Sequence, residues 1–360
     1  MAGRRTALLR GVAALVRIRG VPAVSPPLRW PDEVDEVLDA DVVAALAYRT
    51  PAGGVIVTGV SPIGLRDRDA GTVGFTTSLG FGRKLERIRR HPEIALAYHA
   101  REHGSSRRPD YVLVQGTVTS VVLPDAGYLR DEIGRRAERY LGPARGGPFW
   151  DRWLRVYYRD RVVATVQVQR VVRWSTLDCR DEPEVIGPPL PPGGLSQSPP
   201  RKGTGPRLDS RRARRRLQAL PHRLLGFVQP DGLPMVLPIS VVAAGAGGLT
   251  VRTASRRLPP GGIRAGILGH KFYEHVAGFT SRQYTGWLTV DDSDGVTGTY
   301  APHTQRNLAL PHSKTLALLV NGAVATITYR QALRKGRGGL LDVTDSPPQF
   351  DKDRRSAGPS

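Results

Sequence analysis

The chain has 360 residues, of which 40% are hydrophobic and 24% are charged, and 53 Lys and Arg against 32 Asp and Glu give it a formal net charge of +21. This composition excludes an intrinsically disordered chain, and the length suits about two globular domains. A single cysteine, Cys179, excludes an internal disulfide, and no apolar run is long enough to span a membrane. We therefore expect a cytoplasmic protein with no membrane partner.

The positive charge is mainly arginine, since only six of the 53 basic residues are lysines. A chain this rich in Ala, Gly, Pro and Val indicates that GC-rich coding contributes to the arginine excess. The densest run lies between Arg201 and Arg216, where eight basic residues accompany one acid, Asp209. No aromatic RNA-binding pattern, zinc finger or basic heptad region accompanies it, so the sequence disfavours nucleic acid as a partner and leaves the role of the run open.

The first half of the chain predicts a helix followed by a β-rich unit. Apolar residues at helical spacing predict a helix over 32–45, and a hairpin follows over 46–61. The remaining elements, in chain order, are a strand at 73–77, a short amphipathic helix at 82–90, strands at 93–99 and 111–121, a polar helix at 124–140 and a strand at 162–174.

A linker separates this half from the next. Six prolines lie among Gly and Ser between residues 187 and 205, a composition that stays extended. The predicted division of the chain is an N-terminal segment at 1–30, a first domain at 31–180, the linker at 181–206, a second domain at 207–335 and a flexible tail at 336–360.

The two halves share an internal repeat. The segment 48–54 recurs 179 positions later at 227–233, with a strand expected on either side in both copies. At nearly the same offset, 73–77 matches 249–253, His91 matches His270, and 114–118 matches 284–288. Two homologous domains with hairpin-connected strands and few helices follow, so we predict a mainly β fold with some α, built from mostly antiparallel strands closed into barrels.

Residues 76–84, Thr-Thr-Ser-Leu-Gly-Phe-Gly-Arg-Lys, form a strand end, a loop and a helix start. Free backbone N–H groups at a helix N-terminus, hydroxyls beside them and two cations in the first turn suit a phosphate. An ordinary solvated helix start would use the same residues, so both interpretations stay open. A dinucleotide-binding turn is poorly supported, because Leu85 replaces the third glycine of that motif.

The run from Val73 to His99 has the form strand, Thr-Thr-Ser, loop, Arg-Lys, helix, His-Pro, strand. With the strand 111–118 that follows it, this run resembles the split β-barrel flavin-binding family typified by pyridoxamine 5'-phosphate oxidase, together with its deazaflavin-dependent relatives. The resemblance covers about residues 35–175 and, in weaker form, 210–300. It implies two tandem split β-barrel domains. The cofactor-binding residues that it implies are Thr76, Thr77, Ser78, Arg83, Lys84, Gln115 and Trp174.

The resemblance implies an oxidoreductase that binds FMN or the deazaflavin coenzyme F420 and transfers hydride to or from a small organic substrate. The alternative is a non-catalytic protein that holds or sequesters a flavin or haem, although haem is not the expected cofactor. A third, disfavoured, function is nucleic-acid binding through the basic linker. No catalytic residue is identified, and the sequence does not choose between FMN and F420.

The family usually forms homodimers, and two barrels in one chain resemble such a dimer fused into an intrachain pseudo-dimer, as a monomer or a further homodimer. Gly262 and Ile263 stand opposite Arg83 and Lys84 in the second half. We therefore predict at most one high-affinity cofactor site per chain.

Two histidines, His99 and His103, are spaced four apart as metal ligands on a helix could be. They follow a strand in a polar segment, so we predict solvated loop histidines and no metal site. His270 is expected to be a partly buried packing residue, and Cys179 to be inert.

Overall fold

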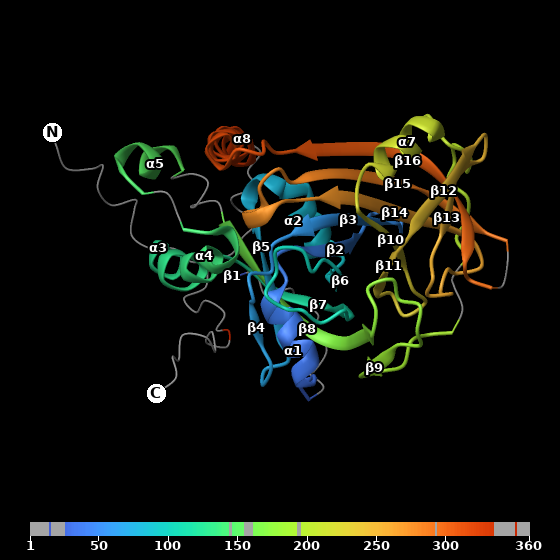
Figure 1. The fold of residues 1–360 in the computed structure, drawn as a ribbon, viewed down its shortest axis with the longest axis horizontal. Coiled ribbons are helices and arrows are strands. Elements are labelled where there is room, and N and C mark those ends of the chain that lie inside the picture. The colour runs from blue at the N-terminus through green and yellow to red at the C-terminus, as the bar shows by residue number, and fades with distance from the viewer. Residues whose placement is uncertain are drawn as a thin grey trace.

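A computed structural model describes residues 14–15, 26–143, 146–154, 161–192, 196–291, 294–334 and 350 (Figure 1). The described residues form two sheets of nine and seven strands, and all of their strand pairs are antiparallel. The predicted fold class and its tandem arrangement are therefore confirmed. Most of the predicted N-terminal segment and tail lies outside the described residues.

The first sheet comes from the first half of the chain and runs in the order β3-β2-β6-β7-β8-β5-β4, with β1 added against β7 and β9 against β8. Its strands are β1 (Ala14–Leu15), β2 (Ala44–Arg49), β3 (Val55–Val60), β4 (Arg66–Asp67), β5 (Thr72–Ser78), β6 (Glu93–Tyr98), β7 (Tyr111–Leu123), β8 (Arg161–Trp174) and β9 (Glu184–Ile186). A bridge between Ser61 and Thr76 joins the end of β3 to β5, so this sheet curls on itself. Strand β9 lies within the segment predicted as linker.

The helical elements of this half are α1 (Asp32–Ala40), the 3-10 turn η1 (Leu79–Phe81), α2 (Gly82–Arg90), α3 (Ala126–Tyr128), the π-helical turn η2 (Leu129–Gly134), α4 (Arg135–Leu141) and α5 (Pro148–Trp153). The predicted helices at 82–90 and 124–140 are confirmed. The predicted helix at 32–45 is wrong in its last turn, because α1 ends at Ala40 and residues 44–45 belong to β2. Residues 42–47 are buried on both faces of a strand that lies between β3 and β6, which is the burial of an interior strand.

The second sheet repeats this arrangement in the order β11-β10-β14-β15-β16-β13-β12. Its strands are β10 (His222–Val228), β11 (Pro234–Pro238), β12 (Ser240–Gly245), β13 (Gly248–Arg252), β14 (Gly261–Lys271), β15 (Thr280–Val290) and β16 (Thr297–Ala309). Helix α7 (Ser210–Gln218) precedes it, the short turn η3 (Glu274–Val276) lies within it, and α8 (Lys314–Arg334) follows it.

The two sheets also agree in detail. In the β2–β3 turn, the Thr50 amide donates to the Gly54 carbonyl, and in the β10–β11 turn the Gln229 amide donates to the Leu233 carbonyl, 179 positions later in each case. The β7–β8 and β15–β16 pairs each shift register just before a glycine, Gly116 in one and Gly286 in the other. The repeat predicted from the sequence is therefore present in turns, strand order and bulges.

One predicted match of the repeat is wrong. His91 ends helix α2, whereas His270 lies in strand β14 opposite His222 of β10. No helix joins β13 to β14, so the segment equivalent to α2 is missing and the offset between the copies falls from 179 to 171. The residue equivalent to His270 is then His99, at the end of β6.

The position of His99 corrects a second expectation. Its side chain is buried, not solvated, with Nε2 2.7 Å from Nε2 of His270 in the other half. The ring of His222 lies against both. His270 is fully buried, and His103 is exposed as predicted. The sequence pattern missed this contact because it joins residues 171 positions apart.

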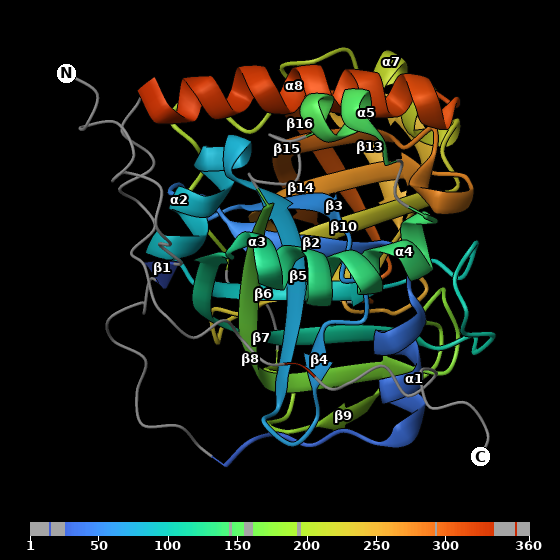
Figure 2. The ribbon, with the colours of Figure 1, turned by 90° about the vertical axis from the view of Figure 1, so that its left-hand side faces the viewer.

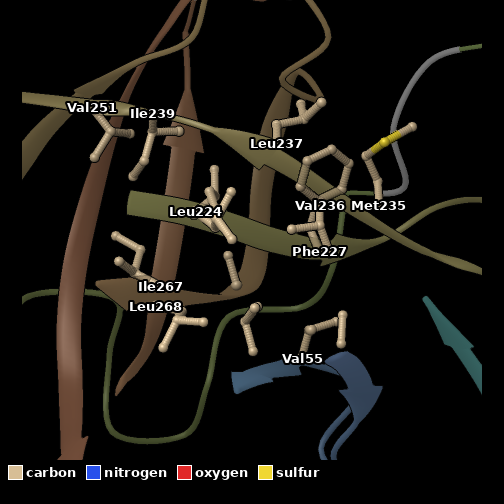
Figure 3. Close-up of a cluster of buried hydrophobic side chains, with 14 of the residues drawn as sticks. Val55, Leu224, Phe227, Met235, Val236, Leu237, Ile239, Val251, Ile267 and Leu268 are labelled. Atoms are coloured by element: carbon tan, nitrogen blue, oxygen red, sulfur yellow. The ribbon is translucent and has the colours of Figure 1, made fainter. Parts of the chain in front are cut away.

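The two halves share one hydrophobic core. A single cluster contains residues of β2, β3, β6, β7 and β8 together with residues of β10, β11, β13, β14, β15 and β16. Figure 3 shows Val55 of the first half below Leu224, Ile267 and Leu268 of the second. Gln197 of the linker bonds to both halves. Its side-chain Nε2 donates to the Gly53 carbonyl at 3.1 Å, and its backbone N–H donates to the Gly262 carbonyl at 2.8 Å. The chain thus folds as an intrachain pseudo-dimer.

Helix α8 crosses one end of the molecule, with α5 beside it (Figure 2). Trp153 of α5 donates from its indole Nε1 to the Leu319 carbonyl at 3.2 Å, and α8 also contacts the η1 turn. Among the helices of the described ranges, none is long and apolar enough to cross a membrane.

Candidate functional site

Strand β5 ends where the sequence predicted an anion-binding loop and helix start. Ser78 caps the η1 turn, because its Oγ accepts a hydrogen bond from the Gly80 amide at 3.0 Å. Helix α2 begins directly afterwards at Gly82 without a side-chain cap on its N-terminus. Amides of its first turn have no acceptor within the helix, so this end of α2 carries partial positive charge.

Lys84 is the central cation of this region. Only 9% of the residue is exposed, and its Nζ lies 4.8 Å from the centroid of the Phe81 ring. Burial lowers the pKa of Lys84 to about 7, and the nearby positive charges of Arg161 and Arg306 act in the same direction. Within the described residues no carboxylate acts on the Lys84 ammonium group to oppose this shift. The buried ammonium group therefore stands among cations without a counterion.

These neighbours come from distant parts of the chain. Arg161 opens strand β8 and pairs with Ser78 across β5 and β8, which brings it to the start of the η1 turn. Arg306 belongs to β16 of the second half, and its side chain is exposed. Both halves therefore contribute to one positively charged region.

The contacts of Tyr48 in β2 identify Arg87 as a fourth cation of this region. Burial raises the pKa of the Tyr48 hydroxyl, while the charges of Arg87 and Arg306 oppose that rise. Arg87 lies three residues after Lys84 on α2, so it shares a helix face with it. We call Lys84, Arg87, Arg161 and Arg306 the cationic cluster.

The three hydroxyl residues predicted beside the loop differ in their contacts. Thr76 donates to the Ser61 carbonyl at 3.4 Å, and Ser78 caps the turn. The Thr77 Oγ1 is buried and has no hydrogen-bond partner in the described part of the chain. Arg83, by contrast, is exposed. A buried hydroxyl without a hydrogen-bond partner destabilises the folded state. Thr77 therefore has a free donor that a ligand could satisfy.

Gln115 lies elsewhere, in the seam between the halves. Its Nε2 donates to Gln229 Oε1 at 2.8 Å and to the Pro234 carbonyl at 2.7 Å, and its Oε1 accepts from Arg170 at 2.9 Å. Arg170 also pairs with Asp231 at 2.7 Å. The polar atoms of Gln115 are thus all engaged between the two sheets.

Trp174 also lies away from the cluster. It ends strand β8, whose 14 residues begin with Arg161, so roughly 40 Å of strand separates the two residues. Its ring is fully buried and packs edge-on against Tyr111 with centroids 5.5 Å apart. Its indole Nε1 has no hydrogen-bond partner among the described residues.

The internal symmetry explains this division. Gln115 and Thr285 each precede the bulge glycine of their own half, and each bonds across to the neighbouring strand, Gln115 to Arg170 and Thr285 to Thr304. The first pair is closed over by the β10–β11 turn. In the second pair Thr285 is half-buried and Thr304 is exposed, and Thr304 lies two residues before Arg306 on β16. The molecule therefore has one closed and one open version of the same surface, and the open one carries the cationic cluster.

Sequence reasoning placed Thr76, Thr77, Ser78, Arg83 and Lys84 together, and the structure brings these residues to one loop and helix start. It missed Tyr48, Arg87, Arg161 and Arg306. Arg87 could have been found from its helical spacing to Lys84. Arg161 and Arg306 had no local signal, because strand pairing and the fold of the second half bring them in.

The cationic cluster fits an anionic ligand such as a phosphate. Among the described residues, the buried Lys84 has no counterion and the buried Thr77 hydroxyl has no hydrogen-bond partner. An anion with several oxygens would satisfy both, and the N-terminus of α2 adds a favourable dipole. The residues present therefore suit the phosphate of a cofactor tail.

Other candidate chemistry is poorly supported. In the ranges that the structure describes, no group of three or more His, Cys, Asp or Glu residues could hold a metal ion. Cys179 is buried, and burial raises the pKa of its thiol far above its ordinary value, so it is no nucleophile at neutral pH.

Comparisons with known proteins gave matches among solved structures alone, since no protein-family profile and no curated protein matches the chain. A protein from Clostridium acetobutylicum described as related to general stress protein 26 of the pyridoxinephosphate oxidase family is 10% identical, with a TM-score of 0.29. The match covers 43% of this chain and 92% of that one.

Two further structures are similar over part of the chain. One, described as an F420 reductase, is 19% identical with a TM-score of 0.28, over 41% of this chain and all of that one. The other, a pyridoxamine 5'-phosphate oxidase-related, FMN binding protein from Nostoc punctiforme, is 10% identical with a TM-score of 0.27, over 61% of this chain and 98% of that one. The descriptions of the Clostridium and Nostoc proteins name the oxidase family, and the third description does not.

Proposed function

We propose that the protein binds the phosphate-bearing tail of FMN or coenzyme F420 at the cationic cluster and acts as an oxidoreductase. The observation that carries this proposal is Lys84, whose ammonium group is buried near Arg161 and Arg306 and has no carboxylate partner among the described residues. An unpaired buried charge destabilises the folded protein. A bound anion would compensate that charge and offset the destabilisation.

Each residue has a defined part in the proposal. Lys84, Arg87 and Arg161 would neutralise the phosphate, Thr77 would donate its hydroxyl proton to it, and Arg83 would approach it from the exposed side of α2. Bound FMN or F420 would supply hydride chemistry for a small organic substrate. Gln115 and Trp174 would act on this site only through the packing of the sheets, given their places in the seam.

The second half would supply one wall of the site through Arg306. The symmetry-equivalent surface is filled by Gln115, Arg170 and Asp231, and no helix joins β13 to β14. We therefore propose one cofactor per chain. In this proposal the protein works in the cytoplasm, either as a monomer or as a further homodimer.

A non-catalytic cofactor carrier is the second candidate. The charged groups that act on Lys84 and Tyr48 are arginines, and a protein that only holds the cofactor would need no other kind of charged group there. Nucleic-acid binding through α7 and the basic run is the third candidate and has no support beyond charge.

Titration of the cofactor-free protein with FMN and with F420, followed by fluorescence, tests the proposal. We expect one site per chain and a dissociation constant that rises at least about tenfold in Lys84→Gln and in Arg306→Gln. Arg89→Gln, on the same helix but outside the cluster, is the matched control and should bind as the wild type does.

Two results would reject the proposal. One is equal binding by Lys84→Gln and the control, and the other is two equivalent sites per chain. Reduction and reoxidation of the bound cofactor with a substrate panel then separates the enzyme from the carrier, because a carrier gives no turnover with any member.

A further inference from the structure

The outer face of helix α8 is apolar and exposed. Leu316, Val324 and Ile327 are between 49% and 57% exposed, and their spacing places them on one side of the helix. The sequence has no charged residue between Lys314 and Arg330. A helix that turns such a face to the outside of a globular protein is exceptional, because the outer face of a surface helix is ordinarily polar.

The apolar face continues onto neighbouring elements. Phe149 and Trp153 of α5 stack with centroids 6.2 Å apart, and Trp153 is bonded to α8. Figure 2 shows α5 lying against α8. The η1 turn that α8 contacts presents Phe81, and the end of β16 presents Leu308. Seven of the nine large hydrophobic side chains exposed in the described ranges therefore lie on these four elements; we call them the apolar face.

Exposed arginines border this face. Arg330 and Arg334 continue the outer side of α8 toward its C-terminus, and Arg152 lies on α5 beside Trp153. One exposed acid, Asp151, accompanies them. Aromatic and aliphatic side chains with a basic border are the combination that binds the interface of a membrane containing anionic lipids.

We propose that the apolar face docks on the surface of an anionic lipid bilayer, with α8 lying parallel to it. Charge complementarity selects this occupant over a second copy of the chain. In a two-fold dimer across this face the arginine border would meet itself, and each chain carries a net charge of +21, whereas anionic headgroups neutralise both.

This docking is compatible with the absence of a spanning helix among the described residues, because a helix in the plane of the interface needs one apolar side and not a full apolar span. The sequence alone led us to expect no membrane partner, since that expectation was based on the length of apolar runs. The apolar face becomes visible only when α8, α5, η1 and β16 are assembled. The proposal does not depend on the cofactor.

Co-sedimentation of the full chain with vesicles tests the proposal. Vesicles of phosphatidylcholine containing phosphatidylglycerol should bind the wild type at least about tenfold more tightly than phosphatidylcholine alone. The triple variant Leu316→Gln, Val324→Gln and Ile327→Gln should bind the anionic vesicles at least about tenfold more weakly. Gln keeps helix propensity and charge, so only apolar area is lost.

Val242→Gln is the matched control, because Val242 is 40% exposed on β12, outside the apolar face. It should bind vesicles as the wild type does. Arg330→Gln with Arg334→Gln should weaken binding to anionic vesicles and leave cofactor titration unchanged, which also shows that the variant is folded.

Three outcomes would overturn the proposal. The first is a wild-type chain that binds no vesicle, and the second is a triple variant that binds as tightly as the wild type, which would assign the attraction to net charge alone. The third is a stable dimer, measured by light scattering, that the triple variant converts to monomer, which would assign the face to a second copy.

Discussion

Lys84 opposes folding of the cofactor-free protein, whereas in the proposed function the same residue favours binding of an anion. Its ammonium group is buried near Arg161 and Arg306, and its pKa lies near 7 instead of its ordinary 10.5. The folded state therefore favours the neutral amine, so protonation at or below pH 7 destabilises the cofactor-free protein. Residues that destabilise the unliganded protein in this way are typical of ligand-binding sites, where stability is lost in favour of activity.

Replacing this cation should stabilise the cofactor-free protein. Lys84→Met keeps an unbranched apolar side chain and removes the buried charge, so we expect the free energy of unfolding at pH 7 to rise by on the order of 2 kcal/mol. Urea unfolding without cofactor measures it, with Arg89→Met as the control on the same helix. A destabilised Lys84→Met variant would mean that the buried amine has a partner.

The same pKa predicts how affinity depends on pH. An anion bound beside Lys84 favours the protonated form, so below pH 7 the free site is already charged and affinity is flat with respect to this group. Above pH 7 the free site must take up a proton on binding, and the dissociation constant should rise by up to about tenfold per pH unit as far as pH 9.

Titrations at pH 7, 8 and 9 measure this slope. Lys84→Gln should bind weakly with no such slope over this range. A wild-type affinity that stays constant between pH 7 and pH 9 would remove Lys84 from the binding site.

At the scale of elements, each sheet contains a β-bulge glycine at the equivalent position. A Cβ at Gly116 would collide with the Gln167 carbonyl, and one at Gly286 would collide with the Ala301 carbonyl. Both glycines follow a register shift between two long neighbouring strands of their sheet. The bulges bend these strands, and that bend lets each sheet wrap around the shared core.

Alanine at either bulge should therefore destabilise the protein. We expect Gly116→Ala and Gly286→Ala each to lower the free energy of unfolding by about 2–4 kcal/mol, because the neighbouring carbonyl belongs to the backbone and cannot turn away. Gly205→Ala is the control, since nothing lies within 4 Å of a Cβ there. Thermal denaturation measures all three, and a neutral Gly116→Ala would mean that the strands can shift register.

At the scale of the whole molecule, the seam between the halves contains a neutral histidine pair. His99 Nδ1 lies 2.9 Å from the Ala97 carbonyl, so it carries the proton, and its Nε2 must accept from His270 Nε2. Burial, with the nearby His222, lowers the pKa of His99 to about 3 and also lowers that of His270. Arg101 beside the pair adds to the shift at His99, and Glu102 is bonded to His222 at 2.5 Å.

This pair should make the fold sensitive to acid. The unfolded histidines take up protons near pH 6.5, whereas the folded pair stays neutral, so stability falls as the pH drops below 6.5 and His99 stops contributing near its folded pKa of about 3. We expect a loss of about 1–3 kcal/mol per pH unit between pH 6.5 and pH 5.

Urea unfolding at pH 7, 6 and 5 measures the slope. The double variant His99→Gln and His270→Gln should flatten it, because an amide pair does not titrate, and His103→Gln, at an exposed position, should leave it unchanged. An unchanged slope in the double variant would place the acid sensitivity elsewhere.

Much of the fold could be predicted from sequence because its signals are local. Alternation of residue types with a period of two identified the long strands, and helical spacing identified α2 and the run from α3 to α4. The end of α1 was misplaced, because residues 42–47 are apolar on both faces and period alone does not separate such a strand from a helix. The error at His91 had a different origin, since a constant repeat offset holds only where both copies keep every element, and the second half lacks the equivalent of α2.

The sequence by itself determined that two related β-rich halves lie on one chain, and that one of them keeps a loop and helix suited to an anion. Both properties depend on residues close together in the sequence, because local spacing determines turns, helix starts and their hydrogen bonds. Tertiary structure alone decided that Arg161 and Arg306 join Lys84, that Gln115 lies in the closed surface, and that His99 meets His270. Each of these is a contact across sheets, set by strand register and the shared core, and no local pattern encodes it.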